Sequence, residues 1–138
     1  MERFRMELES LSKNEEFARV VVTVFISRLD PTLEEIDDVK TAVSEAVTNA
    51  EIHGYGGEKG AITVEVETEG KELTVVVEDY GVGIRDIEKA MEPMFTTDKT
   101  GTRSGMGFSF MEAFMDQVHV ESEPGKGTKV VMRKQIGR

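Results

Sequence analysis

The sequence predicts a domain that combines α-helices with a β-sheet, because its apolar residues follow two different spacings. Apolar and polar residues alternate near the N-terminus and again in the second half of the chain, as in strands with one buried face. Two long stretches between these regions instead have apolar residues at helical spacing. With 138 residues and no linker rich in Pro, Gly or Ser, the chain is expected to form a single domain over residues 1–138.

The first 31 residues predict a strand followed by a helix. Residues 4–8 alternate apolar and charged side chains, which gives the strand one apolar face. Ser12 followed by Glu15 has the spacing of a capping box, and the helical apolar spacing then continues to about Leu29. We expect Asp30 and Pro31 to end this helix, because proline disfavours helical backbone before it.

A second helix is predicted directly after this break. Thr32 followed by Glu35 forms another capping box, and apolar residues at helical spacing continue to His53. Glycines at 54, 56 and 57 then end the helix. The remaining predicted elements are a hairpin at residues 62–77, a short helix at 87–91, a lid at about 92–106, a helix at 107–115 and a last hairpin at 118–132.

The composition excludes several classes of function. The formal net charge of −10 disfavours nucleic acid as a direct partner, because phosphate binding needs clustered Lys and Arg. The chain contains no cysteine, which excludes disulfides and thiol chemistry. No apolar stretch is long enough to span a membrane and no secretory signal precedes the first strand, so we expect a cytoplasmic protein that does not contact membranes.

The second predicted helix carries polar residues at every fourth position, which places them in one stripe at the edge of the apolar face. Glu45 is the candidate general base, since a carboxylate there can accept a proton from a hydroxyl group or water. Asn49 is the candidate metal ligand, because its oxygen can bind Mg²⁺ without adding charge where phosphates already supply anionic oxygens. His53 is interpreted as a structural residue near the helix end, where it can interact with the terminal carbonyl groups.

A second motif, Asp79-Tyr-Gly81-Val-Gly83, follows a strongly apolar strand. The carboxylate of Asp79 should lie at the end of the sheet, where it can accept a hydrogen bond from the exocyclic amine of adenine. Guanine has a carbonyl group at that position and would be rejected. Gly81 and Gly83 allow the backbone to approach a ligand, although an ordinary turn with an Asx-type hydrogen bond explains the same pattern.

A third motif, Arg103-Ser104-Gly105-Met106-Gly107, leads from the predicted lid into a helix. Free N–H groups and the helix dipole at such a position can hold phosphates. The alternative is a flexible loop in which Ser104 is a simple cap. Arg103 could neutralise charge on a transferring phosphate, contact a carboxylate of a partner, or be a solvated loop charge.

The three motifs together predict an ATP site, and in this order they resemble the N, G1 and G2 boxes of the ATPase and kinase superfamily of gyrase, heat-shock chaperones, histidine kinases and MutL. The motifs Val43–Ala50, His53-Gly-Tyr55, Met94–Thr97 and Arg103–Phe108 are similar to those of anti-sigma-factor serine kinases, in particular those of sporulating bacteria. The resemblance covers nearly the whole chain.

This resemblance implies an α+β fold, a two-layer α/β sandwich of Bergerat type, in which a mixed sheet carries helices on one face. It implies ATP or ADP and Mg²⁺ as ligands, with the nucleotide held under the lid. It further implies that a homodimer binds and inhibits a sigma factor and phosphorylates a serine of an anti-anti-sigma protein.

By motif, the resemblance assigns Glu45 as the base and Asn49 as the magnesium ligand. It assigns Asp79 to adenine, Gly81 and Gly83 to the turn, and Gly105 and Gly107 to the phosphate loop. Thr128, in Gly125-Lys-Gly-Thr128, matches a threonine that helps to hold adenine through water.

Three other functions share parts of this pattern. A histidine-kinase catalytic domain needs a phospho-accepting histidine on a helical dimer module, and the two histidines here, His53 and His119, fall in a predicted helix and a predicted strand. A nucleotide-switched clamp would use Glu45 to activate water and hydrolyse ATP without acting as a protein kinase. A pure binding module would sequester a sigma factor and use the nucleotide only to set affinity.

Overall fold

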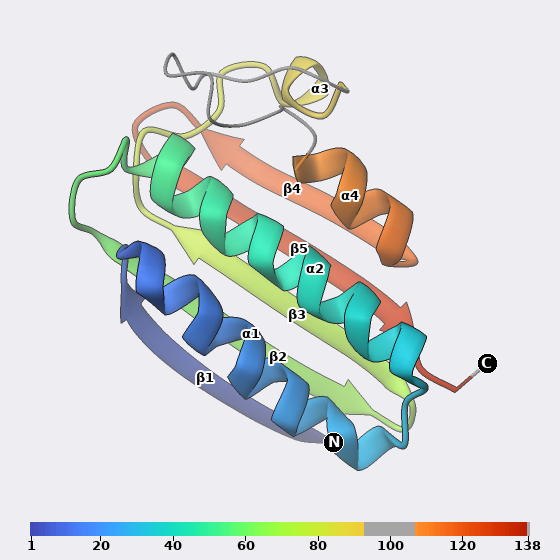
Figure 1. Cartoon of the computed structure of the whole chain (residues 1–138). Helices are drawn as coiled ribbons and strands as arrows, with labels where there is room; N and C mark the ends of the chain where they lie inside the picture. The colour runs from blue at the N-terminus through green and yellow to red at the C-terminus, as the bar shows by residue number, and fades with distance from the viewer. Residues whose placement is uncertain (93–106, 138) are drawn as a thin grey trace.

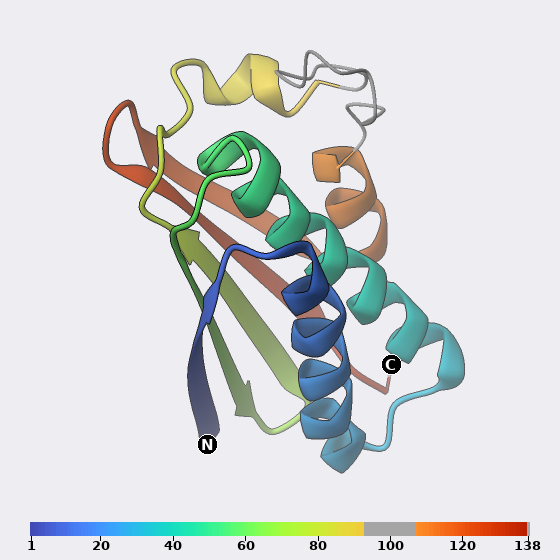
Figure 2. The same ribbon diagram turned by 60° about the vertical axis from the view of Figure 1, so that its left-hand side comes forward.

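The computed structural model describes residues 1–92 and 107–137 of the chain. One layer is a five-stranded sheet, and helices α1, α2 and α4 lie together on one of its faces (Figures 1 and 2). The predicted α+β sandwich is therefore confirmed. The elements are β1 (Glu2–Glu9), α1 (Ser12–Ile26), a 3₁₀ turn (Ser27–Leu29), α2 (Leu33–Asn49), a π-helical turn (Ala50–Gly54), β2 (Ala61–Glu69), β3 (Glu72–Asp79), α3 (Ile87–Ala90), α4 (Gly107–Phe114), β4 (Gln117–Glu123) and β5 (Gly127–Gln135).

The sheet has the strand order β1-β2-β3-β5-β4, and every neighbouring pair in it is antiparallel. The mixed sheet that the resemblance implies is therefore not observed in the described residues. The connections explain the difference: β2–β3 and β4–β5 are hairpins, whereas two helices that run in opposite directions separate β1 from β2 (Figure 1). The chain reverses its direction three times, from β1 to α1, from α1 to α2 and from α2 to β2, so β2 enters the sheet antiparallel to β1.

The helix-covered face of the sheet is apolar in successive rows across the strands. One row contains Val66, Val75, Met132 and Val118, and the next contains Val64, Val77, Val130 and Val120. All but Val118 are buried, and they pack with apolar residues of α1 and α2 in one core. The alternation seen in the sequence is thus the alternation between this core and the open face of the sheet.

Only one of the two predicted capping boxes forms. The Thr32 side chain accepts from the N–H group of Glu35, and the Glu35 carboxylate accepts from the N–H group of Thr32, so the box that begins α2 is confirmed. The box predicted at Ser12 is wrong, because Leu11 is the N-cap of α1 and makes no side-chain capping bond. Asn14 instead donates its side-chain amide to the carbonyl of Glu9, which ties the start of α1 to the end of β1.

Helix α2 ends in a π-helical turn at Ala50–Gly54, directly after Asn49. Such turns frequently occur at functional sites. With 17 residues, α2 is the longest of the described helices, and acidic residues occupy its first turn.

In the ranges that the structure covers, no helix is long and apolar enough to cross a membrane.

The core should depend on the inner face of α1 far more than on its outer face. Val22 has no exposed surface, whereas 66% of Val24 on the same helix is exposed. We expect Val22→Ala to lower the free energy of unfolding by about 2 kcal/mol, because it removes buried methyl groups and leaves a cavity. Val24→Ala is the matched control and should be neutral or slightly stabilising, since alanine has the higher helix propensity. Urea unfolding of both variants measures the difference, and equal losses would contradict the described packing.

Candidate functional site

The apolar rows of the sheet give way to a polar row at one end. The next row on the same face contains Ile62, Asp79, Thr128 and Ser122, which are paired in register across β2, β3, β5 and β4. Three neighbouring strands thus place polar side chains next to one another where β3 and β4 end and β5 begins. The last turn of α2 lies over the same end of the sheet (Figure 1).

Asp79 is buried at the centre of this row, with 5% of its surface exposed. Its Oδ1 accepts a hydrogen bond of 2.9 Å from the N–H group of Gly81. Burial raises the pKa of the Asp79 carboxyl, while backbone hydrogen bonds from Gly81 and Thr128 act in the opposite direction. The sequence placed Asp79 at the end of the sheet beside a turn, and the structure has it there.

The turn after Asp79 packs directly against the end of α2. The N–H group of Val82 donates to the carbonyl oxygen of Gly54 at 2.9 Å, and a methyl group at Gly81 would lie 1.9 Å from that same oxygen. Gly83 has a φ of +76°, which favours glycine, and its Cα faces the backbone of Glu123. Both predicted glycines therefore serve a close approach between the turn and its neighbours.

The absence of a side chain at Gly54 is needed for the same packing. A methyl group there would lie 2.8 Å from Cγ and Oδ1 of Asp79. The π-helical turn therefore brings backbone of α2 directly onto the buried carboxylate.

The phenol of Tyr55 joins the end of α2 to two strands, a contact that the sequence analysis did not predict. Its hydroxyl donates to the carbonyl of Ala61 at 2.5 Å and accepts from the N–H group of Tyr80 at 2.8 Å. Gly60 lies against the ring, because a methyl group there would be 2.3 Å from a ring carbon. Burial raises the pKa of the Tyr55 hydroxyl. The signal in the sequence was only the position of Tyr55 directly after His53-Gly54.

The hydroxyl of Ser122 is a second connection that the sequence did not predict. It accepts from the N–H group of Ile84 at 2.7 Å, donates to the carbonyl of Gly127 at 2.8 Å, and lies 2.9 Å from the hydroxyl of Thr128. Ser122 thereby connects the turn after Asp79 with the β4–β5 hairpin. Nothing in the local sequence distinguishes it from an ordinary strand serine.

Glu45 and Asn49 come together at the start of α4. A methyl group at Gly107 would lie 2.9 Å from Nδ2 of Asn49 and 3.2 Å from Oε2 of Glu45. Both side chains are half-buried. Two residues of the polar stripe predicted on α2 therefore face Gly107, the first residue of α4 and the last glycine of the third motif. His53 is also half-buried, in the π-helical turn.

The remaining residues of the third motif are not described by the structure. Arg103, Ser104, Gly105 and Met106 lie outside residues 1–92 and 107–137, as does nearly all of the predicted lid at 92–106. Their roles remain predictions from the sequence.

The residues present fit a metal ion that is held mainly by the phosphates of a bound nucleotide and only in small part by the protein. Within the described ranges, no group of three or more His, Cys, Asp or Glu residues could hold a metal by itself. Mg²⁺ that accompanies phosphates usually takes only one or two protein ligands, and the amide of Asn49 beside Glu45 fits that requirement.

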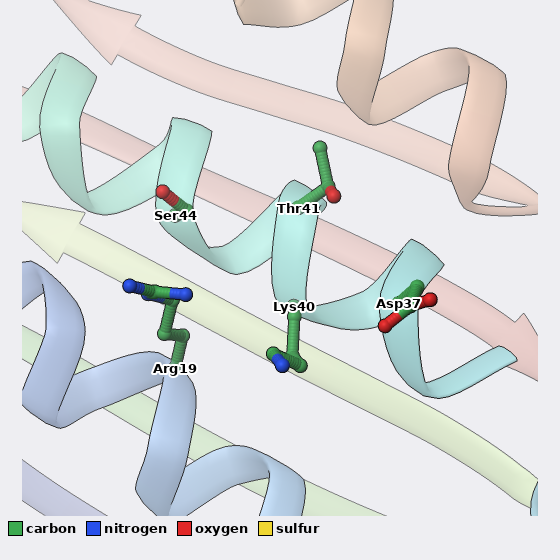
Figure 3. Close-up of a pocket in the computed structure, with 5 residues that line it drawn as sticks. All are labelled: Arg19, Asp37, Lys40, Thr41 and Ser44. Atoms are coloured by element: carbon green, nitrogen blue, oxygen red, sulfur yellow. The ribbon is translucent and has the colours of Figure 1, made fainter. Parts of the chain in front are cut away.

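A separate open hollow of about 220 Å³ lies between α1 and α2 and is shown in Figure 3. Arg19 extends from α1 toward α2 and forms an ion pair of 3.0 Å with Glu15 on its own helix. None of the residues at this hollow belongs to the predicted site. They are Arg19, Asp37, Lys40, Thr41 and Ser44.

Comparison with known proteins defines the class of this fold and site. A family model described as a histidine kinase-like ATPase domain matches residues 8–134. This range includes the polar row, the turn after Asp79 and the contact of Glu45 and Asn49 with Gly107.

Curated relatives narrow the class further. An anti-sigma F factor of Clostridium acetobutylicum is 60% identical over 134 residues, which are 96% of this chain and 94% of that protein. The anti-sigma F factor of Thermoanaerobacter pseudethanolicus is 58% identical with the same coverage of both chains. The chain therefore belongs to the anti-sigma F factor family, within the histidine kinase-like ATPases, as the motif resemblance predicted.

Solved structures of low sequence identity share the fold. The RsbU and RsbW domains of Rv1364c from Mycobacterium tuberculosis match 99% of this chain with a TM-score of 0.69 and 18% identity, and the chain covers 32% of that structure. Full-length ShkA, solved in complex with AMPPNP, matches 73% of this chain with a TM-score of 0.58 and 18% identity. The chain covers 22% of ShkA.

The buried charge of Asp79 should make the protein without nucleotide less stable than a neutral variant. Because its pKa is raised above the unfolded value of about 4, the charged carboxylate costs stability above the raised pKa, and this cost disappears at pH values below the unfolded pKa. We expect Asp79→Asn to have the higher melting temperature at pH 7, with a difference that shrinks as the pH falls toward about 4.

Glu65→Gln is the matched control, since it removes a half-buried carboxylate of the neighbouring strand β2 that lies opposite Val76, away from Asp79 in the register. Thermal melts at several pH values, without nucleotide, give both differences. An Asp79→Asn protein that melts below the wild type at pH 7 would contradict this account of the buried carboxylate.

Proposed function

We propose that the chain is an anti-sigma factor and a protein serine kinase that uses Mg²⁺ and ATP. In this proposal it binds and inhibits a sporulation sigma factor, and it phosphorylates a serine of an anti-anti-sigma protein. The high identity to anti-sigma F factors supports the sigma-factor partner. The histidine kinase-like ATPase family supports use of the nucleotide.

The observation that carries the proposal is the contact of two α2 side chains with the start of α4. Glu45 and Asn49 lie against Gly107, where the N-terminal N–H groups of a helix favour phosphate. A proton acceptor and an amide oxygen therefore lie beside a helix start, and we assign the phosphates of the nucleotide to this helix start. A carboxylate so placed would be next to the terminal phosphate of a nucleotide.

Adenine recognition is assigned to the polar end of the sheet. Asp79 would accept from the exocyclic amine of adenine, and Thr128, opposite Asp79 in the ladder, would assist through water. Gly81 and Gly83 shape the turn beside the base. The packing at Gly54 supports this assignment, because the residue beside the Asp79 carboxylate has no side chain.

The remaining nucleotide contacts follow from the motif resemblance. Asn49 would hold Mg²⁺, which when bound neutralises charge on the phosphate oxygens. Ser104, Gly105, Met106 and Gly107 would supply the phosphate loop. Arg103 would stabilise charge on the transferring phosphate.

Transfer in this site is a displacement at the terminal phosphorus. The hydroxyl oxygen of the partner's serine forms a bond to the γ-phosphorus, and the bond from that phosphorus to the bridging oxygen breaks, so that ADP leaves. The serine proton passes to the carboxylate of Glu45. A positioned base of this kind contributes a factor of about 10²–10⁴ to the rate.

The partners are proteins in the cytoplasm, and a homodimer of the chain is the proposed binding unit. The closest competing function is a nucleotide-switched clamp that sequesters the sigma factor and hydrolyses ATP without protein kinase activity. Both functions would use the same nucleotide contacts, so only the fate of the phosphate distinguishes them.

The test is transfer of label from γ-labelled ATP to the serine of a candidate anti-anti-sigma protein. We expect Glu45→Ala to lower the transfer rate by at least about 10²-fold, because it removes the base, and to change ATP affinity by less than about threefold. Glu34→Ala is the matched control, since Glu34 is an exposed carboxylate in the first turn of the same helix. GTP should not replace ATP.

The results separate the proposed functions. Label on serine that is lost only in Glu45→Ala supports the kinase and its base. Release of labelled phosphate without transfer supports the clamp. Transfer by Glu45→Ala at the wild-type rate would show that Glu45 is not the base.

A further inference from the structure

The Tyr55 hydroxyl lies at the position where the β2–β3 ladder would otherwise continue. The last pair in register is Ile62 and Asp79, so Ala61 and Tyr80 would be the next residues opposite each other. Instead, the phenol oxygen lies between them, donates to Ala61 and accepts from Tyr80. The two strands therefore separate one residue after Asp79, and the chain turns toward Gly54.

The other end of the turn is held by Ser122. Its hydroxyl accepts from the N–H group of Ile84, so Tyr55 and Ser122 bind the first and last amides of residues 80–84. Between them, Gly81 donates to Asp79 and Val82 donates to Gly54. The orientation of the Asp79 carboxylate thus depends on a turn held at both ends by side-chain hydroxyls from other elements.

Ser122 also determines which way the Thr128 hydroxyl donates. Ser122 has a single hydroxyl hydrogen, and the Gly127 carbonyl, 2.8 Å away, can only accept it. All three contacts of Ser122 are satisfied when Thr128 donates to Ser122 across their 2.9 Å separation. The Thr128 hydroxyl then offers only lone pairs to the space beside Asp79, so both residues are acceptors.

We propose that Ser122 and Tyr55 are positioning residues for base recognition: Tyr55 and Ser122 fix the turn that orients Asp79, and Ser122 makes Thr128 an acceptor beside it. This inference rests on the proposed use of Asp79 and Thr128 to bind adenine. Two acceptors side by side match a purine with an amine at position 6. A purine with a carbonyl group at position 6 instead presents a hydrogen-bond acceptor, directly or through water, to Asp79 and Thr128, which are acceptors themselves.

The experiment begins with amide hydrogen exchange of the protein without nucleotide. We expect Tyr55→Phe to speed exchange of the Tyr80 amide, and Ser122→Ala that of the Ile84 amide, by about 2- to 10-fold, because each loses one hydrogen bond. Ser27→Ala is the matched control. It removes a hydroxyl that donates to the Val24 carbonyl at the end of α1, away from the turn.

Nucleotide affinity is then measured by calorimetry with ATP and with ITP, which has a carbonyl group at position 6. Tyr55→Phe should weaken ATP binding about 5-fold or more through the loosened turn. Ser122→Ala should also lower the ratio of ATP to ITP affinity, because Thr128 becomes free to donate. Ser122→Thr keeps the hydroxyl and should restore most of that ratio. In the transfer reaction, KM for ATP should rise in both hydroxyl-deletion variants while kcat is retained.

The outcomes distinguish this inference from the proposed function. If the wild type does not bind ATP, the proposed function fails and the inference fails with it. If the wild type binds ATP and the Tyr55→Phe and Ser122→Ala proteins match it in affinity and in the ATP to ITP ratio, the inference alone is wrong. Loss of stability with an unchanged ratio in Ser122→Ala, or no rescue by Ser122→Thr, would mean that Ser122 is merely structural.

Discussion

The site is arranged around a carboxylate that the fold buries at the end of its core. Asp79 continues the inward-facing alternation of Val75 and Val77, so a charged group occupies a position in the register that would otherwise be apolar. A buried carboxylate requires hydrogen-bond donors, and here they come from the backbone of the turn and of β5. Gly81, which supplies one of these donors, also lies close to the carbonyl group of Gly54.

Two different kinds of packing meet at this end of the molecule. The strand ends supply the polar row of Asp79, Thr128 and Ser122, whose positions follow from the register of the sheet. The contact of α2 with α4 supplies Glu45 and Asn49, whose positions follow from helical periodicity and from the missing side chain at Gly107. The π-helical turn connects the helix contact with the strand ends, because it follows Asn49 directly and its last residue, Gly54, lies against the Asp79 carboxylate.

Much of this arrangement followed from local patterns in the sequence. The alternation of apolar and polar residues predicted that Asp79 lies at an end of the sheet. The spacing of four residues between Glu45 and Asn49 predicted that they lie on the same side of α2. Three features did not follow. Ser12 has the same capping pattern as Thr32, but the Asn14 contact with β1 prevails at that helix start. The π-helical turn changes the helical phase after Asn49, and the contacts of Tyr55 and Ser122 join segments distant in sequence.

The strand order also determines which strands remain at the edges of the sheet. Within residues 1–92 and 107–137, β1 and β4 each pair with a strand on one side only, and an outer strand edge of this kind can pair with a strand from another chain. β1 carries charges along its length, because Arg3, Arg5 and Glu7 alternate with apolar residues, whereas the charges of β4 lie at its end, at Glu121 and Glu123. Charged side chains on edge strands oppose uncontrolled association, and the acidic end of β4 therefore protects the molecule from aggregation next to the very hairpin that forms the site.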